Sequence, residues 1–176
     1  MLEIILHIDL ICFFKKEFFF YIEYNMRLFF FLLNNKCDFL LSNDLDTLAA
    51  NFLISKIKHV KLIYDSHELF TELPELIHRP VKKKIWLHLE SFCLPRLKYA
   101  FTVSKSISNY YKNKYGINMS VIYNFPVSKK IKSTYSSSKK TIIYQGSVNK
   151  DRGIELMIQA MLYVDAQLII VGSGDL

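Results

Sequence analysis

The chain has 176 residues, of which 51% are hydrophobic, so it is long enough to bury a core in one domain or two small ones. Its net charge of +7 fits a phosphate-bearing ligand, an anionic membrane surface or nucleic acid, and does not choose among them. The three cysteines, Cys12, Cys37 and Cys93, are odd in number and far apart. They argue against a disulfide framework and a CxxC metal site, and favour reduced thiols in the cytoplasm.

The first 36 residues are unusually hydrophobic and rich in Phe, Leu and Ile. A secretory signal is not expected, because no cationic segment precedes the apolar stretch and no small-residue cleavage site follows it. Charged residues such as Lys15, Glu23 and Arg27 leave no apolar run of the ~20 residues that a bilayer span needs. The pattern predicts a strand over residues 4–14 and a largely buried helix over residues 17–34. Interfacial membrane contact by this segment is the alternative.

From residue 38 onward, apolar runs alternate with helical patterns. Residues 39–41 are predicted as a strand, and the following helix has these apolar residues on one face: Leu45, Leu48, Ala49, Phe52 and Leu53. Residues 60–64 form the next predicted strand, and a polar group follows it: Asp65, Ser66, His67 and Glu68. Because the carboxyl ends of strands line the ligand crevice of open α/β sheets, these four residues are site candidates. An HExxH zinc site is rejected, since Thr71 stands where the second His would be needed.

The middle of the chain continues the alternation. Residues 69–78 are predicted as a loop, Pro80 opens a helix that runs to about Phe92, and residues 100–103 and 120–123 are strands. Ser104 is expected to cap a helix that runs through Tyr111. The helix after Pro80 opens with basic residues close to Trp86. It could rest on anionic headgroups with the ring at the interface, but a solvated face with a core tryptophan is the commoner arrangement.

Residues 127–140 have the composition of a linker, rich in serine and lysine and without apolar periodicity. They divide the chain into a first domain over residues 1–126, with residues 1–36 atypical, and an incomplete second domain over residues 141–176. Nucleic-acid binding by this basic run is not expected, because the interleaved aromatic residues of a stacking platform are absent apart from Tyr135.

Residues 141–155 have the pattern of a strand, a turn and a helix. The helix is predicted to begin near residue 151 and to place these residues on one apolar face: Ile154, Met157, Ile158, Met161 and Leu162. Its first turn would present unpaired N–H groups and partial positive charge, which attract phosphate. Gly146 and Gly153 allow close approach to the backbone, and Lys150 and Arg152 add full charges. An ordinary βα turn with solvated cations is the alternative.

A strand over residues 166–171 follows, and its turn contains Gly172 and Gly174. Six segments in this order, 38–48, 64–68, 101–104, 121–126, 144–153 and 171–174, resemble family-4 (group 1) glycosyltransferases of the GT-B fold. The resemblance implies two Rossmann-like parallel-sheet units that face each other across a cleft. It implies a glycan or lipid-linked acceptor bound mainly by the first unit, and a nucleotide-diphosphate-sugar donor bound by the second. The implied reaction is a retaining sugar transfer that requires no cofactor and no metal.

The resemblance also assigns residues. The Gly146 turn and Arg152 resemble the diphosphate-binding segment, in which the family more often has Lys at the position of Arg152, and Gly172 and Gly174 resemble the next donor-side loop. Lys150 and Gly153 join these donor-side candidates because of their place in the turn. His67 and Glu68 correspond to acceptor-side residues of the cleft, as do Asn43 and Asp44. During transfer, negative charge grows on the leaving diphosphate, and a cation with fixed dipoles would stabilise it.

Two parts of the family pattern have no counterpart. No Glu in this chain is followed by another eight positions later, so the E-x7-E carboxylate pair is missing and the catalytic residues are unassigned. The family's first strand and glycine-rich turn are not recognisable in residues 1–36. We therefore expect the middle of a longer cytoplasmic transferase, inactive alone, with the inner membrane face as its candidate site of peripheral contact.

Other classes of protein stay open. A non-catalytic nucleotide-binding remnant would keep part of the diphosphate cradle, and a membrane-peripheral interaction module would use the helix over residues 82–86 and the aromatic N-terminus. A response-regulator-like domain is a weaker third, because the paired acidic residues that would accompany Asp65 are not evident.

Overall fold

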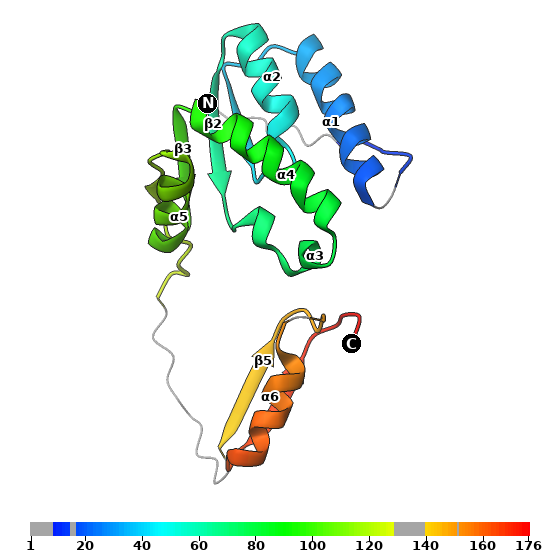
Figure 1. Cartoon of the computed structure of the whole chain (residues 1–176), viewed down its shortest axis with the longest axis vertical. Coiled ribbons are helices and arrows are strands. Elements are labelled where there is room, and N and C mark those ends of the chain that lie inside the picture. The colour runs from blue at the N-terminus through cyan, green and yellow to red at the C-terminus, as the bar shows by residue number, and fades with distance from the viewer. Residues whose placement is uncertain (1–8, 15–16, 129–139, 151) are drawn as a thin grey trace. The chain divides into compact units, whose positions relative to one another are not determined.

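The computed structural model describes residues 9–14, 17–128, 140–150 and 152–176 (Figure 1). The protein is α/β and consists of two compact units, Met1–Phe125 and Pro126–Leu176. The first contains a four-stranded sheet and the second a two-stranded sheet, and both sheets are parallel, as the alternation of strands and helices predicted. Most of the predicted linker, residues 129–139, lies outside the described residues.

The first unit opens with α1 (Glu17–Asn34), which has the predicted bounds. The prediction that this helix is largely buried is wrong, because Phe19, Met26 and Phe30 are exposed. The elements that follow are β1 (Phe39–Asn43), α2 (Leu48–Lys58), β2 (Lys61–Ser66), η1 (Phe70–Glu72), α3 (Pro74–Ile77), α4 (Pro80–Cys93), η2 (Leu94–Arg96), β3 (Tyr99–Thr102), α5 (Lys105–Tyr115) and β4 (Ser120–Val121). The strand predicted over residues 4–14 is wrong in its described part, because residues 9–14 form no strand; residues 4–8 lie outside the description.

Local signals explain where several helices begin and end. Pro80 occupies the first turn of α4, where its missing N–H costs no hydrogen bond. Ser104 caps α5, as predicted, since its side chain accepts a hydrogen bond from the Ile107 amide at 3.3 Å. Gly116 ends α5 in the left-handed conformation with φ 72°, which favours glycine.

The core of the first unit lies between one face of the sheet and the helices. The strand order is β1-β2-β3-β4, and Leu40, Leu62 and Tyr64 point from the strands into this core. They meet buried residues of α2 and α5, among them Leu48 and Tyr111. In Figure 1, α1, α2 and α4 lie to one side of β2.

Trp86 is part of this core. The side chain is buried, and its ring packs edge-on against Tyr21 of α1 and Phe70 of η1, with centroids 5.3 and 5.1 Å away. The interpretation that put this ring at a membrane interface is therefore wrong, and the core-tryptophan alternative is confirmed. Trp86 joins α1 and η1 to α4.

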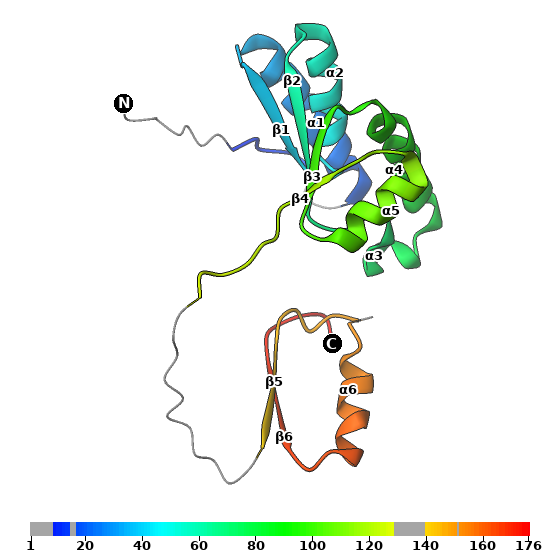
Figure 2. The same cartoon turned by 90° about the vertical axis from the view of Figure 1, so that its left-hand side faces the viewer.

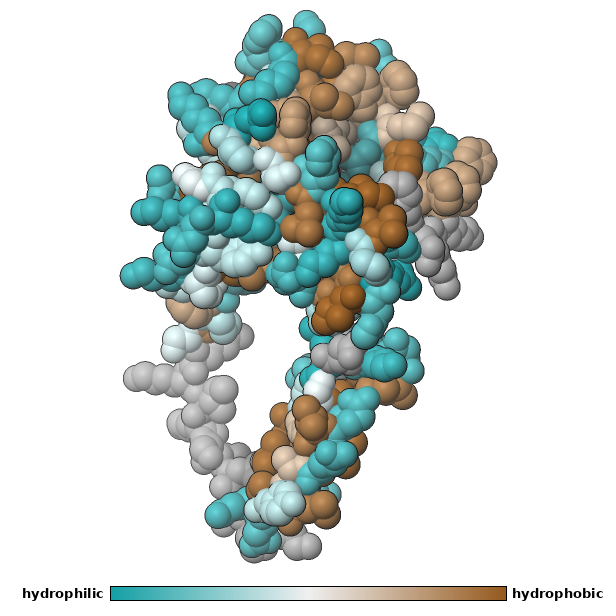
Figure 3. Space-filling model, viewed as in Figure 1, coloured by the Kyte–Doolittle hydropathy of each residue, from teal (hydrophilic) through white to brown (hydrophobic). Residues whose placement is uncertain are grey.

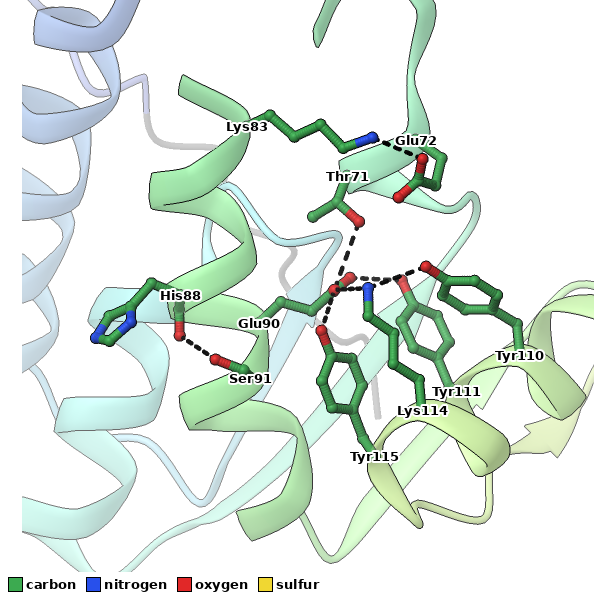
Figure 4. A network of polar contacts seen from close by, with 10 residues as sticks. All are labelled: Thr71, Glu72, Lys83, His88, Glu90, Ser91, Tyr110, Tyr111, Lys114 and Tyr115. Carbon is green, nitrogen blue, oxygen red and sulfur yellow. Dashed lines mark hydrogen bonds and ion pairs between the residues drawn. The ribbon is translucent and has the colours of Figure 1, made fainter. Parts of the chain in front are cut away.

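A buried carboxylate connects α4 with α5 (Figure 4). Glu90 has no exposed surface, and its Oε2 accepts hydrogen bonds from the hydroxyl of Tyr115 at 2.6 Å and from the ammonium of Lys114 at 3.2 Å. Its Oε1 accepts a bond from the Tyr111 hydroxyl at 3.2 Å, and Thr71 approaches Oε2 at 3.4 Å. These donors compensate for the cost of burying the charge.

The network makes the stability of the first unit sensitive to alkaline pH. Burial, and next the hydrogen bond to Glu90, raise the pKa of Tyr115 to about 12. Above the ordinary tyrosine pKa of about 10, the unfolded state loses a proton that the folded state keeps, so stability falls as pH rises from about 10 through 12. Urea unfolding followed by Trp86 fluorescence should show this loss, and Tyr115→Phe should reduce its slope with pH. The exposed Tyr163→Phe is the control, and an equal change in slope there would contradict the assignment.

The second unit consists of β5 (Thr141–Gln145), α6 (Ile154–Ala160), η3 (Met161–Tyr163) and β6 (Gln167–Val171). The two strands pair in parallel from Thr141 opposite Gln167 to Gln145 opposite Val171, and α6 lies on one side of them (Figure 2). A helix from near residue 151 was predicted, but α6 begins at Ile154, because Gly153 before it is left-handed with φ 75°.

The apolar face predicted for this helix is only partly buried. Ile154 is buried, whereas Ile158 and Leu162 are exposed, so the prediction is wrong for these two residues. Figure 3 accordingly shows apolar side chains at the surface of this unit. The two strands offer too small a sheet to cover the whole apolar stripe.

Candidate functional site

The first candidate cluster lies where β1 and β2 end. The strands are parallel and in register, with Asn43 opposite Asp65, so their carboxyl ends are adjacent. The amide of Asp44 donates to the carbonyl of Asp65 at 2.8 Å and continues the pairing beyond β1. The strand predicted to end at residue 64 continues to Ser66, so Asp65 and Ser66 belong to the strand and not to the turn.

Asp65 and His67 form a carboxylate–imidazole pair in this cluster. Oδ2 of Asp65 lies 2.9 Å from Nε2 of His67, and the exposed fractions of the two side chains are 11% and 49%. Oδ1 of Asp65 is buried without a hydrogen-bond partner in the described part of the chain. The carboxylate orients the ring and leaves the second ring nitrogen to exchange a proton or a hydrogen bond with a ligand hydroxyl.

Asp44 fixes the backbone beside this pair. Its Oδ1 accepts the amide N–H of His67 at 3.0 Å, and its own backbone is left-handed with φ 53°. Burial raises the pKa of Asp44, the hydrogen bond and charge of His67 act against this shift, and the Asp65 carboxylate adds to it. Asp44 thus holds His67 in position from the β1 side.

The structure brings together some of the predicted acceptor-side residues. Asp44 and His67 are in contact, whereas Asn43 is exposed at the end of β1. Glu68 is exposed, and its carbonyl accepts a hydrogen bond from the Ser66 hydroxyl at 3.0 Å. Asp65 emerges as the partner of His67. Asp65 and His67 are two residues apart, and in an extended chain this spacing places both side chains on one face. The sequence could have indicated the pair in this way.

The second candidate cluster consists of the loops that follow β5 and β6. The amide of Gly146 donates to the carbonyl of Val171 at 3.0 Å, and the amide of Val148 donates to that of Ser173 at 3.0 Å. The amide of Leu176 donates back to Val148 at 3.2 Å. These bonds extend the parallel pairing past both strands, so the two loops form one unit.

This pairing explains two of the predicted glycines. A Cβ on Gly172 would overlap the carbonyl oxygen of Gly146, and one on Gly174 would overlap the carbonyl of Val148. The loops can approach only because both positions lack side chains. A Cβ on Gly153 would meet only open space, so its φ of 75° is what favours glycine there.

The predicted cations lie in the same loop region. Lys150 and Arg152 are exposed, and Asp151 between them lies outside the described residues. The amide of Lys150 donates to Oδ1 of Asp175 at 3.1 Å, and that of Arg152 donates to the carbonyl of Asn149 at 3.3 Å. The sequence interpretation missed Asp175, which directly follows Gly174. The turn therefore directs an N–H at an anionic oxygen.

Comparison of the sequence with protein-family models and with curated proteins gave no match. Among the residues that the structure describes, none of the helices is both long enough and apolar enough to cross a membrane. Within the same residues, His, Cys, Asp and Glu side chains do not gather in groups of three that could hold a metal ion.

Proposed function

We propose that this chain provides the donor-diphosphate loops and acceptor-side residues of a retaining glycosyltransferase of the GT-B type. The donor would be a nucleotide-diphosphate-sugar and the acceptor a glycan or a lipid-linked molecule. The observation that carries the proposal is the pair of joined loops after β5 and β6, with Lys150 and Arg152 exposed beside them. Parallel α/β sheets bind ligands at the carboxyl ends of their strands, where these loops lie.

The chemistry asked of the second unit is binding and charge stabilisation. Breaking the bond between the sugar and the diphosphate leaves negative charge on the phosphate oxygens. Two cations and the backbone N–H groups of the loop would stabilise that charge more strongly in the transition state than in the ground state. The Lys150 amide already donates to a carboxylate oxygen, which supports a role for this turn in holding anions.

The chemistry asked of the first unit is recognition of hydroxyl groups. The imidazole of His67 is half exposed and is oriented by Asp65, so it can donate to or accept from a sugar hydroxyl. We further place the proposed enzyme in the cytoplasm, with contact at the inner membrane face when the acceptor is lipid-linked. Its three cysteines are odd in number and far apart in the sequence, which supports a reducing compartment.

The proposal predicts how nucleotide affinity depends on charge in the loops. Arg152→Ala should weaken the binding of a nucleoside diphosphate about tenfold, because a charge-assisted hydrogen bond contributes about 1.5–3 kcal/mol. Asp175→Asn should strengthen binding several-fold, because the variant removes a negative charge from beside the Lys150 amide. Isothermal titration with uridine and guanosine diphosphates would measure both effects.

Lys140→Ala provides the control for this experiment. Lys140 precedes β5 at the opposite end of the strand, where its carbonyl accepts the Gln167 amide, and its side chain is exposed. Removal of this cation should leave the affinity unchanged. If all three variants behaved alike, or if neither diphosphate bound the wild-type chain, the proposed donor loops would be wrong.

A further inference from the structure

Among the described residues, the helices that pack on the four-stranded sheet all lie on one of its faces. Its order is β1-β2-β3-β4 with all pairs parallel, so each crossover connection steps to the next strand in the same direction. Crossovers between parallel strands are right-handed, and three such steps place all the connecting helices on one side. Burial along β1 agrees, because Leu40 is buried while Phe39 and Leu41 on the opposite face are exposed.

The opposite face, here called the open face, is apolar. The strand registers place its side chains in adjacent rows, with Leu41 beside Ile63 and Ile63 beside Tyr99. The open face comprises Phe39, Leu41, Ile63, Tyr99, Phe101 and Ile122. A groove of about 390 Å³ crosses it and is lined by most of these residues. Parallel sheets are normally covered on both faces, and exposed apolar patches of this kind mark interaction sites.

One edge of the open face is strongly basic. Lys61 and Lys98, at the amino ends of β2 and β3, line the groove and also an adjacent hollow of about 280 Å³. Lys56, His59 and Arg96 line that hollow as well. In the described chain, none of these five side chains forms an ion pair with a carboxylate. These five side chains outnumber the acidic residues at this end of the sheet, where Asp38 precedes β1, so the edge has an excess of positive charge.

This combination specifies a partner. Crossover helices run antiparallel to the strands that they connect, as α2 does between β1 and β2, and we place the covering helix in the same direction because its negative end then meets the basic edge. Its carboxyl end, with partial negative charge, would then lie at the Lys61 and Lys98 edge, where acidic residues in its last turn would pair with the lysines. Apolar residues at helical spacing would cover Leu41 and Ile63.

The described helices of a second copy do not meet that requirement. The last turns of α1, α2, α5 and α6 contain no acidic residue, the last turn of α4 contains only Glu90, which is buried, and α3 has only four residues. We propose that the open face binds an amphipathic α-helix of a different polypeptide, with an apolar side on the groove and an acidic last turn at Lys61 and Lys98.

Two labelled peptides test this proposal on the whole chain. Each has about 14 residues, enough to span about 20 Å as a helix, with leucines at i, i+3, i+4 and i+7. One ends in glutamates and the other in lysines. Fluorescence anisotropy should show the glutamate peptide binding about tenfold more tightly. A double change, Lys61→Glu with Lys98→Glu, should reverse this preference, which a general loss of folding would not do.

Matched variants locate the binding surface. Leu41→Gln on the open face should weaken binding of the glutamate peptide about tenfold or more, because burial of a leucine is lost. Ile57→Gln on α2 should not, although Ile57 is exposed to a similar extent, 53% against 56% for Leu41. Circular dichroism would verify the fold of each variant.

Four results would overturn the proposal. Two concern the peptides: equal affinity for both peptides, or equal weakening of binding by Leu41→Gln and Ile57→Gln. The third is self-association of the chain in sedimentation that Leu41→Gln abolishes. The fourth is binding of the chain to anionic vesicles that Leu41→Gln abolishes, while neither peptide binds.

Discussion

Replacement of Glu90 by alanine should lower the free energy of unfolding of the first unit by about 3 kcal/mol, since breaking a buried ion pair from one side costs roughly 3–5. The change removes the acceptor of the buried Tyr111 hydroxyl. It also removes the carboxylate that pairs with the Lys114 ammonium, whose side chain is 30% exposed. It also removes the Glu90 links from α4 to α5 and to Thr71. Glu90→Gln keeps the volume and some hydrogen bonds, so its loss should be smaller. Urea unfolding monitored by Trp86 fluorescence measures both.

The control is a carboxylate–lysine pair at the surface of the same unit. Glu72 and Lys83 lie 2.7 Å apart, and the Glu72 side chain is 42% exposed. Solvent screens such a pair, so Glu72→Ala should cost less than about 1 kcal/mol. Similar losses for Glu72→Ala and Glu90→Ala would show that burial of Glu90 contributes no more than a surface contact.

Replacement of Gly172 or Gly174 by alanine should unfold the second unit, or should remove most of the protection of its backbone amides against hydrogen exchange. The added methyl group would overlap the carbonyl of Gly146 or Val148. The amides of these two residues and the Val148 carbonyl form the hydrogen bonds that join the loops, so a shift large enough to relieve the overlap would disturb that pairing. Overpacking costs about 1–3 kcal/mol, and a small sheet has little stability to lose. Hydrogen exchange of the β5 and β6 amides, with the β2 amides as internal reference, would detect the change.

Gly153→Ala distinguishes crowding from backbone strain in the same unit. A Cβ at Gly153 meets open space, so alanine there pays only for the left-handed conformation, about 1–2 kcal/mol. Asparagine, which tolerates that conformation, should cost less. Full amide protection in Gly172→Ala together with loss of protection in Gly153→Ala would refute the role given to loop packing.

The sequence predicted those elements whose signals are local. Pro80 marks the start of α4, Ser104 marks the start of α5, and the apolar runs mark β2 and β6. The register of the strands and the burial of individual side chains were harder to predict from the sequence. Leu53 was predicted to share one apolar face with Leu48 and Phe52, which are buried, yet Leu53 is exposed, because the sheet covers a narrower stripe of α2 than the sequence pattern suggested.

The sequence predicted where the polar site residues lie along the strands and loops, but not which residues they bond to. His67, Arg152 and the loop glycines could be placed at strand ends from sequence alone. The Glu90 network could not be found in this way, because its partners lie 19 to 25 residues away and meet it only when α4, α5 and η1 pack. Asp175 was missed because its contact with the Lys150 amide depends on the pairing of two loops.

The sheet of the first unit ends in two very different strands. At one side, β4 has only two residues, and Pro126 follows a few positions later. At the other side, β1 has five residues without proline or charge, and its outer backbone groups face away from β2. Such a strand is a template for strand addition by another chain. Among the strands that the structure describes in the first unit, any tendency to polymerise through the backbone is therefore concentrated in Phe39–Asn43.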